Sequence, residues 1–440
     1  MAWCRGPILA SLIFHGLAAS AGPASGKTGP VAIRAGQLFD GTDDRLRTNL
    51  IILIENGRIT ALGEGVAIPA GAPVINLSGA TVLPGLIDAH AHILFEANVE
   101  GDAALIPLAG QQFLTRTSAR KALDGLRNAQ VLLESGFTTL RDPGDMDVNR
   151  AHLDVRDVIN HGDFPGPRIF AAVHAITRTG GHLDFAWLAA DQPPLGYAHL
   201  VDNPDAMRHA VRKEVKYGAD WIKLAATGGL TTRTNPSESV FTDAELGVAV
   251  EEAHRLGKKI AAHAHGLSGI KGVTRAGVDS IEHATFADAE ALRAIAKAGI
   301  YIVPTFGRRI AKNPDRGNWL ELLRKEPDYK GWPLIANALK LGVKIAFGTD
   351  TGTFAHGLGP RQLAMLVEGG MKPAAAIRTA TSAAADLLDL RDRVARVVVG
   401  MEADLIAVAG NPLTNVQLLE HVGFVMVRGQ VVKNEISANP

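Results

Sequence analysis

The chain has 440 residues, which is long for one ordinary compact domain, and 47% of them are hydrophobic, enough for a large core. Lysine plus arginine and aspartate plus glutamate both number 45, so the formal net charge is zero. This balance argues against a nucleic-acid partner or an anionic membrane surface. The length fits one large α/β barrel with an accessory domain.

The first 21 residues predict a secretory signal peptide. Arg5 precedes an apolar run from Ile8 to Ala19, and a small-x-small cleavage site ends at Ala21. The alternative is a membrane anchor, but the run is shorter than the about 20 residues that a span needs. We therefore expect a periplasmic or secreted protein. Cys4, the only cysteine, would leave with the signal, so any bound metal must use imidazole, carboxylate or lysine-derived ligands.

Both ends of the mature chain predict short strands. Residues 22–84 contain β-type segments separated by the turns ENGR and GEG, and residues 398–440 resume the same pattern with a second turn-like RGQ. We expect the two parts to form one small β-sandwich domain around a central insert, residues 85–397.

The central insert alternates eight apolar runs with amphipathic helical stretches. The runs are TVLPGLIDAHAHI, FTTLRD, RIFAAVHA, WIKLAATGG, KIAAHAHG, DSIEHAT, YIVPTF and VKIAFGTD. Four helical stretches end in glycine, a helix-stop signal, and these span residues 119–136, 204–218, 242–257 and 288–299. Eight strands alternating with helices predict an α/β fold of the (β/α)8 TIM-barrel type.

Several of these runs become polar at their C-terminal ends, which in such a barrel converge on one face. The positions are Asp88, His90, His92, Lys223, His263, His265, Glu282, His283, Thr349 and Asp350. Taken singly, a strand-end histidine can be structural, a lysine can extend to solvent, and Gly-Thr-Asp can begin a loop. Five such strands together favour a functional site, because unpaired buried charges are costly.

The spacing suits metal binding. Alternate residues of a strand point the same way, so His90 and His92 can bind one cation, and His263 and His265 share this geometry. Zinc accepts nitrogen and oxygen ligands readily. His263, His283 and Asp350 can complete a cluster at the mouth of the barrel.

Lys223 is unusual beside such a cluster, because a dication repels an ammonium group. A buried lysine can lose its proton. The neutral amine could then add CO2, and the resulting carbamate could bridge two metal ions.

At these residues the chain resembles the metal-dependent amidohydrolase superfamily, over nearly all of its mature length. LPGLIDAHAHI, GFTTLRDPG, DWIKLAATGG, AAHAHG, SIEHATF and GTDTGT are similar to the strand-one, two, four, five, six and eight motifs, and GMEADLIAVAGNPL to the return into the β domain. The most similar subgroup is the imidazolonepropionase-like one, with Xaa-Pro and Xaa-Arg dipeptidases and ochratoxin A amidohydrolases. The segment HILFEANVEGDAALIPLAG carries no family signature and leaves substrate identity open.

The resemblance implies a role for each matched residue. Two divalent metal ions are expected, with zinc as the first choice. His90, His92 and Asp350 would bind the more buried ion, His263 and His283 the second, and carboxylated Lys223 would bridge both. His265 remains a reserve ligand or substrate contact, because the family ligand is usually the first histidine of HAHG. Imidazolonepropionase and the mononuclear deaminases lack the bridging lysine, so this lysine argues for two metals and for peptide-like amide hydrolysis.

The remaining roles concern the substrate. Asp350 would carry a proton from the attacking water to the leaving amine. His182 could hydrogen-bond the developing oxyanion or simply contact solvent from its loop. Arg233 could pair with a substrate carboxylate or be a solvated loop charge, and Arg141 is a weaker carboxylate partner. Asp88 is expected to orient a ligand rather than bind metal.

We therefore predict a secreted binuclear metal-dependent amidohydrolase that cleaves a dipeptide or N-acyl amino acid, ochratoxin-like substrates included. One alternative is a mononuclear cyclic-amide hydrolase or deaminase of the imidazolonepropionase type. Another is a non-catalytic protein on the same scaffold, which the six filled ligand positions disfavour. The expected partner is a small molecule or dipeptide, with no nucleic acid or membrane, and the family resemblance also allows a homo-oligomer.

Overall fold

The structure is a computed structural model. It describes residues 29–96, 110–184, 189, 191, 196, 198–229, 234–306 and 334–436. The predicted signal peptide and Arg233 lie outside the described residues. Among the helices of the described part, none combines the length and the apolar character that crossing a membrane requires.

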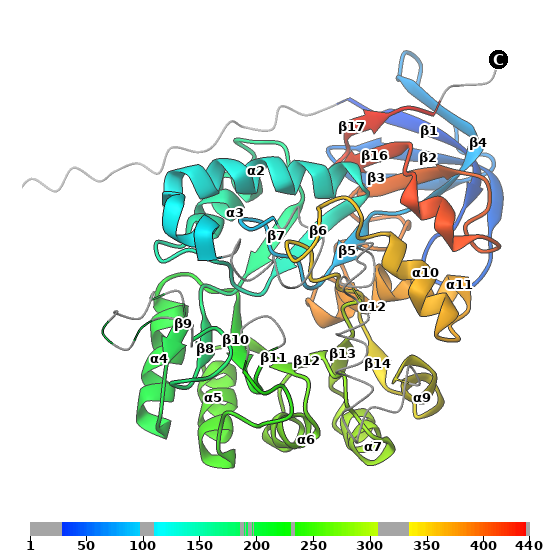
Figure 1. Ribbon diagram of the computed structural model, residues 1–440. Coiled ribbons are helices and arrows are strands. Elements are labelled where there is room, and N and C mark those ends of the chain that lie inside the picture. Colours follow the sequence, from blue (N-terminus) through cyan, green and yellow to red (C-terminus); the bar gives the residue numbers. More distant parts are fainter. Residues whose placement is uncertain are drawn as a thin grey trace, which may run out of the picture.

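Strands from both chain ends share one sheet of seven strands, in the order β17-β16-β15-β4-β1-β2-β3 (Figure 1). β4 joins the two ends, because it pairs in parallel with β1 and antiparallel with β15. The strands are β1 (Val31–Leu38), β2 (Arg47–Glu55), β3 (Arg58–Gly63), β4 (Val74–Pro84), β15 (Leu405–Ala409), β16 (Phe424–Val427) and β17 (Gln430–Asn434). The sandwich description and the domain boundaries stay predictions.

The predicted turns of this sheet are present. Asn56 and Gly57 both have positive φ, 51° and 75°, and connect β2 to β3. Arg428 and Gly429, at 50° and 77°, connect β16 to β17 in the same way. Two-residue hairpins need this left-handed pair, which glycine and asparagine adopt readily.

The central part forms two parallel sheets. Their orders are β14-β13-β12-β11-β10-β8-β9 and β5-β6-β7. The strands are β5 (Leu86–Asp88), β6 (Phe137–Asp142), β7 (Arg168–Ala171), β8 (Ala175–Thr177), β9 (Ala198–Leu200), β10 (Trp221–Ala225), β11 (Lys259–Ala264), β12 (Ser280–His283), β13 (Tyr301–Val303) and β14 (Lys344–Ile345).

Backbone hydrogen bonds link the two parallel sheets at both sides. Ala89 N, after β5, donates to Phe347 O, after β14, at 2.9 Å. Asp220 N, before β10, donates to Ala171 O of β7 at 2.8 Å. These links are consistent with the predicted barrel, although the pairing of the described strands does not run unbroken around a closed ring.

The run RIFAAVHA was predicted as one strand, and this is wrong. The run forms β7 and leaves the strand after Ala171, and only its last residue, Ala175, belongs to β8, which lies in another sheet. Between them Ala172 N donates to Asp142 O at 2.8 Å, and His174 N donates to the Glu214 carboxylate at 2.5 Å. The Ala172 bond continues the β6–β7 ladder by one residue, whereas the backbone N–H of His174 is bound by a side chain of α4.

Helices cover the outer side of the parallel strands, with α4 to α7 following β9 to β12 in turn (Figure 1). Local signals set their ends: Thr242 and Glu245 form a capping box on α5, and α7 runs from its N-cap Asp288 to Gly299, whose φ is 72°. The helices are α2 (Ser118–Glu134), α3 (Ala151–His161), α4 (Pro204–Lys216), α5 (Asp243–Arg255), α6 (Leu267–Ala276), α7 (Ala289–Ala298), α9 (Leu334–Lys340), α10 (Arg361–Glu368), α11 (Pro373–Thr379), α12 (Ser382–Leu387) and the 3-10 helix Val416–Glu420. All four helices predicted to stop at glycine do so within two residues.

Candidate metal centre

The first ligand group joins the residues after β5 to Asp350, which follows β14. His90 Nε2 and His92 Nε2 lie 3.5 and 3.4 Å from Asp350 Oδ1. A zinc ion held tetrahedrally by bonds of about 2.1 Å separates its ligand atoms by about 3.4 Å. Both imidazole nitrogens therefore lie at the distance from the Asp350 oxygen that ligands of one ion require.

The second nitrogen of each imidazole is held by an acceptor. His90 Nδ1 donates to Glu282 Oε2 at 2.6 Å, and His92 Nδ1 donates to the carbonyl oxygen of Gly144 at 2.9 Å. Histidines that ligate metals usually make such a bond through the other nitrogen, which fixes the ring and its tautomer. Both Nε2 atoms are consequently presented as ligands.

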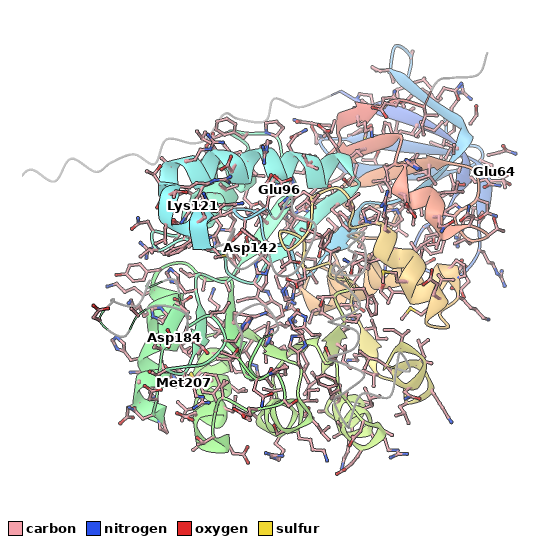
Figure 2. All side chains as sticks on the ribbon, viewed as in Figure 1. Glu64, Glu96, Lys121, Asp142, Asp184 and Met207 are labelled. Atoms are coloured by element: carbon pink, nitrogen blue, oxygen red, sulfur yellow. The ribbon has the colours of Figure 1, made fainter. Side chains whose placement is uncertain are left out.

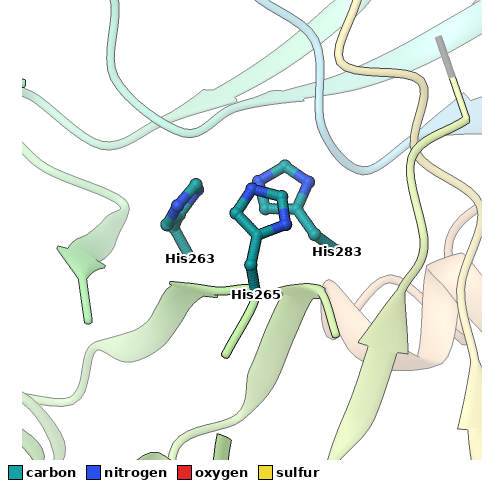
Figure 3. Close-up of side chains that lie close together, drawn as sticks. All are labelled: His263, His265 and His283. Carbon is teal, nitrogen blue, oxygen red and sulfur yellow. The ribbon is translucent and has the colours of Figure 1, made fainter. Parts of the chain in front are cut away.

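The second ligand group lies at the ends of β11 and β12. His263, His265 and His283 have ring centroids 4.6 Å apart in every pairing, and one nitrogen from each lies within 4.8 Å of the others (Figure 3). His283 has a φ of 72°, a left-handed conformation that residues with a side chain seldom adopt. The chain thus turns sharply at the position that brings this ring into the group.

The two groups are neighbours. The ring centroids of His90 and His283 are 5.4 Å apart. His263 Nε2 donates to the carbonyl oxygen of Gly228 at 3.2 Å, which leaves its Nδ1 for a metal. Both His263 and His265 lie in the same ligand group, so the choice of His263 as the β11 ligand stays a prediction.

Lys223 lies on the same face as these ligands. In the β10–β11 register Lys223 pairs with Ala261 and Ala225 pairs with His263, so the lysine sits one side-chain step below that histidine. Lys223 is 5% exposed. Burial and the positive charge of Arg141 lower the pKa of Lys223 to about 8, although the negative charge of Glu282 acts in the opposite direction. A larger fraction of the amine is therefore neutral at physiological pH, which is the form that can react with CO2.

Arg141 does not have the predicted position of a substrate contact, and this expectation is corrected. The side chain is fully buried: Nε donates to Ala89 O at 2.5 Å, Nη1 to Ser280 Oγ at 2.9 Å and Nη2 to Glu282 Oε1 at 2.8 Å. Since Glu282 also binds His90, Arg141 neutralises the carboxylate that orients a ligand. Glu282 had no predicted role, although a carboxylate inside the apolar run DSIEHAT requires a buried partner.

Asp88 has the predicted orienting position. Its buried carboxylate accepts hydrogen bonds from His90 N and Thr349 N at 3.0 Å and from Thr349 Oγ1 at 2.5 Å. Burial raises the pKa of Asp88 to about 7, although the hydrogen bonds that its carboxylate accepts act to lower it. Asp142, at the end of β6 (Figure 2), accepts from Gly144 N at 3.0 Å and so shapes the turn whose carbonyl holds His92.

The predicted oxyanion residue is adjacent to the second group. His182 follows β8, and its ring stacks on that of His263 with the centroids 4.3 Å apart. His182 and His265 are therefore within the cluster, whereas Arg233 is not among the described residues.

Loading the metal-free protein with zinc near neutral pH is expected to displace a proton from His92. Although burial acts in the opposite direction, the hydrogen bond to Asp350 and the charges of Asp145, Asp350 and Asp142 raise the pKa of His92 to about 9. A protonated imidazole cannot ligate, so binding releases this proton below pH about 9, and zinc affinity rises as the pH approaches that value. Calorimetric titration in buffers of different ionisation enthalpy counts the released protons, and zinc binding without proton release near neutral pH contradicts the expectation.

The chain matches the amidohydrolase family over residues 81–432. It is 30% identical to the ochratoxinase of Aspergillus niger over 419 residues, which cover 88% of this chain and 83% of that protein. It is 26% identical to the imidazolonepropionase of Paracoccus denitrificans over 414 residues, with coverages of 88% and 93%. The crystal structure of a Xaa-Pro dipeptidase with bound methionine superposes with a TM-score of 0.81 at 34% identity, over 92% of this chain and 100% of that one.

These similarities confirm the resemblance drawn from the strand-end motifs, where the structure also gathers histidine and carboxylate groups. The enzyme class expected from the sequence, a hydrolase acting on C–N bonds, is confirmed with them. The chain belongs to the amidohydrolase family.

Proposed function

We propose that this hydrolase is a binuclear metal-dependent enzyme that cleaves the amide bond of a dipeptide or an N-acyl amino acid. The observation that carries the proposal is the adjacency of two ligand groups, with the rings of His90 and His283 5.4 Å apart and buried Lys223 one step below His263. The names of the ochratoxinase and the Xaa-Pro dipeptidase support an amide substrate of this class.

The residues present fit two divalent ions. His90, His92 and Asp350 would hold one, His263 and His283 the other, with His265 in reserve, and a carbamate on Lys223 would reach both. When bound, such ions polarise a carbonyl and lower the pKa of water from ~15.7 towards ~7. All protein ligands are nitrogen or oxygen, which suits zinc.

The chain itself supplies proton transfer and positioning. The Asp350 side chain is 19% exposed, so its carboxylate can accept the proton of the attacking water and return it to the leaving amine. His182, stacked on His263, can donate a hydrogen bond to the oxygen that becomes negative in the transition state. Burial of the surrounding histidines strengthens both interactions, because it lowers the local dielectric constant.

Two structural expectations belong to the same proposal. The parallel sheets would form one eight-stranded barrel, supported by the backbone bonds of Ala89 with Phe347 and of Asp220 with Ala171. Residues 1–21 would direct the enzyme to the periplasm or the medium. A mononuclear cyclic-amide hydrolase or deaminase is the second candidate, because the chain is 26% identical to an imidazolonepropionase.

Metal removal tests the proposal. Dialysis of the protein against a strong chelator is expected to abolish hydrolysis of dipeptides and N-acyl amino acids, and zinc is expected to restore it. A parallel screen with cyclic amides and amino-substituted heterocycles covers the second candidate. Activity on those compounds alone, or activity that survives chelation, contradicts the proposal.

A further inference from the structure

A separate group of possible ligands lies on the far side of β10 from β11. It consists of His174, in the turn before β8, His199 on β9 and Glu214 on α4. One ligand atom from each lies within 4.8 Å of the others, and the two rings stand edge to face with centroids 5.4 Å apart. In the β8–β9 register Ile176 pairs with His199, and His174 lies two residues before Ile176. None of these residues belongs to the amidohydrolase ligand groups described above.

The orientation of His174 is the first argument for a cation. Its Nε2 lies 3.2 Å from the carbonyl oxygen of Asp147. A carbonyl only accepts hydrogen bonds, so Nε2 carries the proton, and in the neutral ring Nδ1 has a lone pair. That lone pair lies 3.3 Å from the carboxylate oxygen Glu214 Oε1, which is also an acceptor. Two facing acceptors repel each other unless a proton or a metal ion lies between them.

The same pattern occurs in the amidohydrolase centre. There one nitrogen of His90 donates to a protein oxygen while the other points to Asp350 Oδ1 at 3.5 Å. In the separate group, Glu214 Oε1 is 3.3 Å from His174 Nδ1 and 2.8 Å from His199 Nε2. Ligands of a zinc ion lie about 3.4 Å apart in tetrahedral geometry, so a slight widening at His199 would admit an ion.

The charge of Glu214 is the second argument. Its side chain is 1% exposed, and within the described residues its ion pairs are with these two histidines. A buried carboxylate requires a compensating positive charge. A divalent cation held by Glu214 and the two histidines would supply this charge.

We propose that His174, His199 and Glu214 form a third divalent-metal site, suited to zinc and distinct from the amidohydrolase centre. Two imidazoles and one carboxylate are a known zinc ligand set, and a water molecule can take the fourth position. The ion would join β9 to α4 and to the turn before β8.

Zinc content tests the site. The full chain and its His199→Ala variant are stripped with a chelator, refilled by equilibrium dialysis against zinc, and measured by elemental analysis. The variant is expected to bind one zinc fewer per chain than the unaltered protein. Because the result is a difference, it does not depend on whether the amidohydrolase centre holds one ion or two.

Two further variants sharpen the measurement. Glu214→Gln keeps the size of the side chain and removes its charge, so it is expected to lose the same zinc ion while remaining folded. His254→Ala removes an exposed histidine that pairs with Asp279 at 2.9 Å, and it is expected to keep the full zinc content. Zinc is also expected to raise the melting temperature of the unaltered chain more than that of His199→Ala. Equal zinc content in the unaltered chain, His199→Ala and Glu214→Gln overturns the proposal and leaves a hydrogen-bonded network only.

Discussion

Replacement of Lys223 by alanine is expected to reduce the rate of amide hydrolysis about a thousandfold, which corresponds to about 4 kcal/mol of lost transition-state stabilisation. Lys223 is the buried amine placed below His263 on the ligand face, and its replacement would remove the group proposed to hold both ions together. The variant should also bind less metal. Steady-state kinetics and elemental analysis of the same preparation measure both effects.

A control variant at another lysine separates the loss of the bridging group from a general loss of positive charge. Lys271→Ala removes a lysine of α6 that pairs with Glu290 at 2.8 Å on the surface, and it should leave activity and metal content unchanged. If Lys223→Ala keeps its metal and more than a small fraction of its activity, the lysine does not bridge the ions.

The second large effect is expected for stability. Arg141→Ala should lower the free energy of unfolding by about 3–5 kcal/mol, because it leaves the charge of Glu282 buried without its guanidinium partner. The orientation of His90 depends on the same carboxylate, so metal affinity should fall as well, by about 10–100-fold. Urea denaturation of the metal-free protein and zinc titration measure the two quantities separately.

An exposed ion pair provides the control for the buried pair of Arg141 and Glu282. Arg127 on α2 pairs with Glu96 at 2.5 Å, and its side chain is 59% exposed (Figure 2 labels Glu96). Arg127→Ala should cost less than about 1 kcal/mol, because solvent screens such pairs. Similar losses in the two variants would show that the buried pair has no special part in stability.

The grouping of the candidate ligands could be predicted because their residue types stand out at the ends of the apolar runs. A parallel strand should be apolar to its end, so a histidine, lysine or aspartate at a strand end is visible without coordinates. The structure brings His90, His92 and Asp350 to within ligand distance and gathers His263, His265 and His283. The helix-ending glycines and hairpin turns were visible for the same reason, since their signals are local.

The roles that depend on contacts between distant strands could not be predicted. Arg141 on β6 reaches Glu282 on β12, and nothing in the spacing of FTTLRD shows whether its arginine points to substrate or into the core. The group of His174, His199 and Glu214 joins a turn, a strand and a helix, and its residues share no motif. The end of β7 inside RIFAAVHA is likewise not visible in the run, since after it a side chain of α4 binds the backbone of His174.

Anomalous scattering from a crystal of the zinc-loaded protein tests the binuclear centre most directly. We predict two zinc peaks at this site, one among His90, His92 and Asp350 and one beside His263 and His283, with continuous density from Lys223 Nζ to both. A single peak at the site, with Lys223 unmodified, would contradict the binuclear centre and favour the mononuclear alternative.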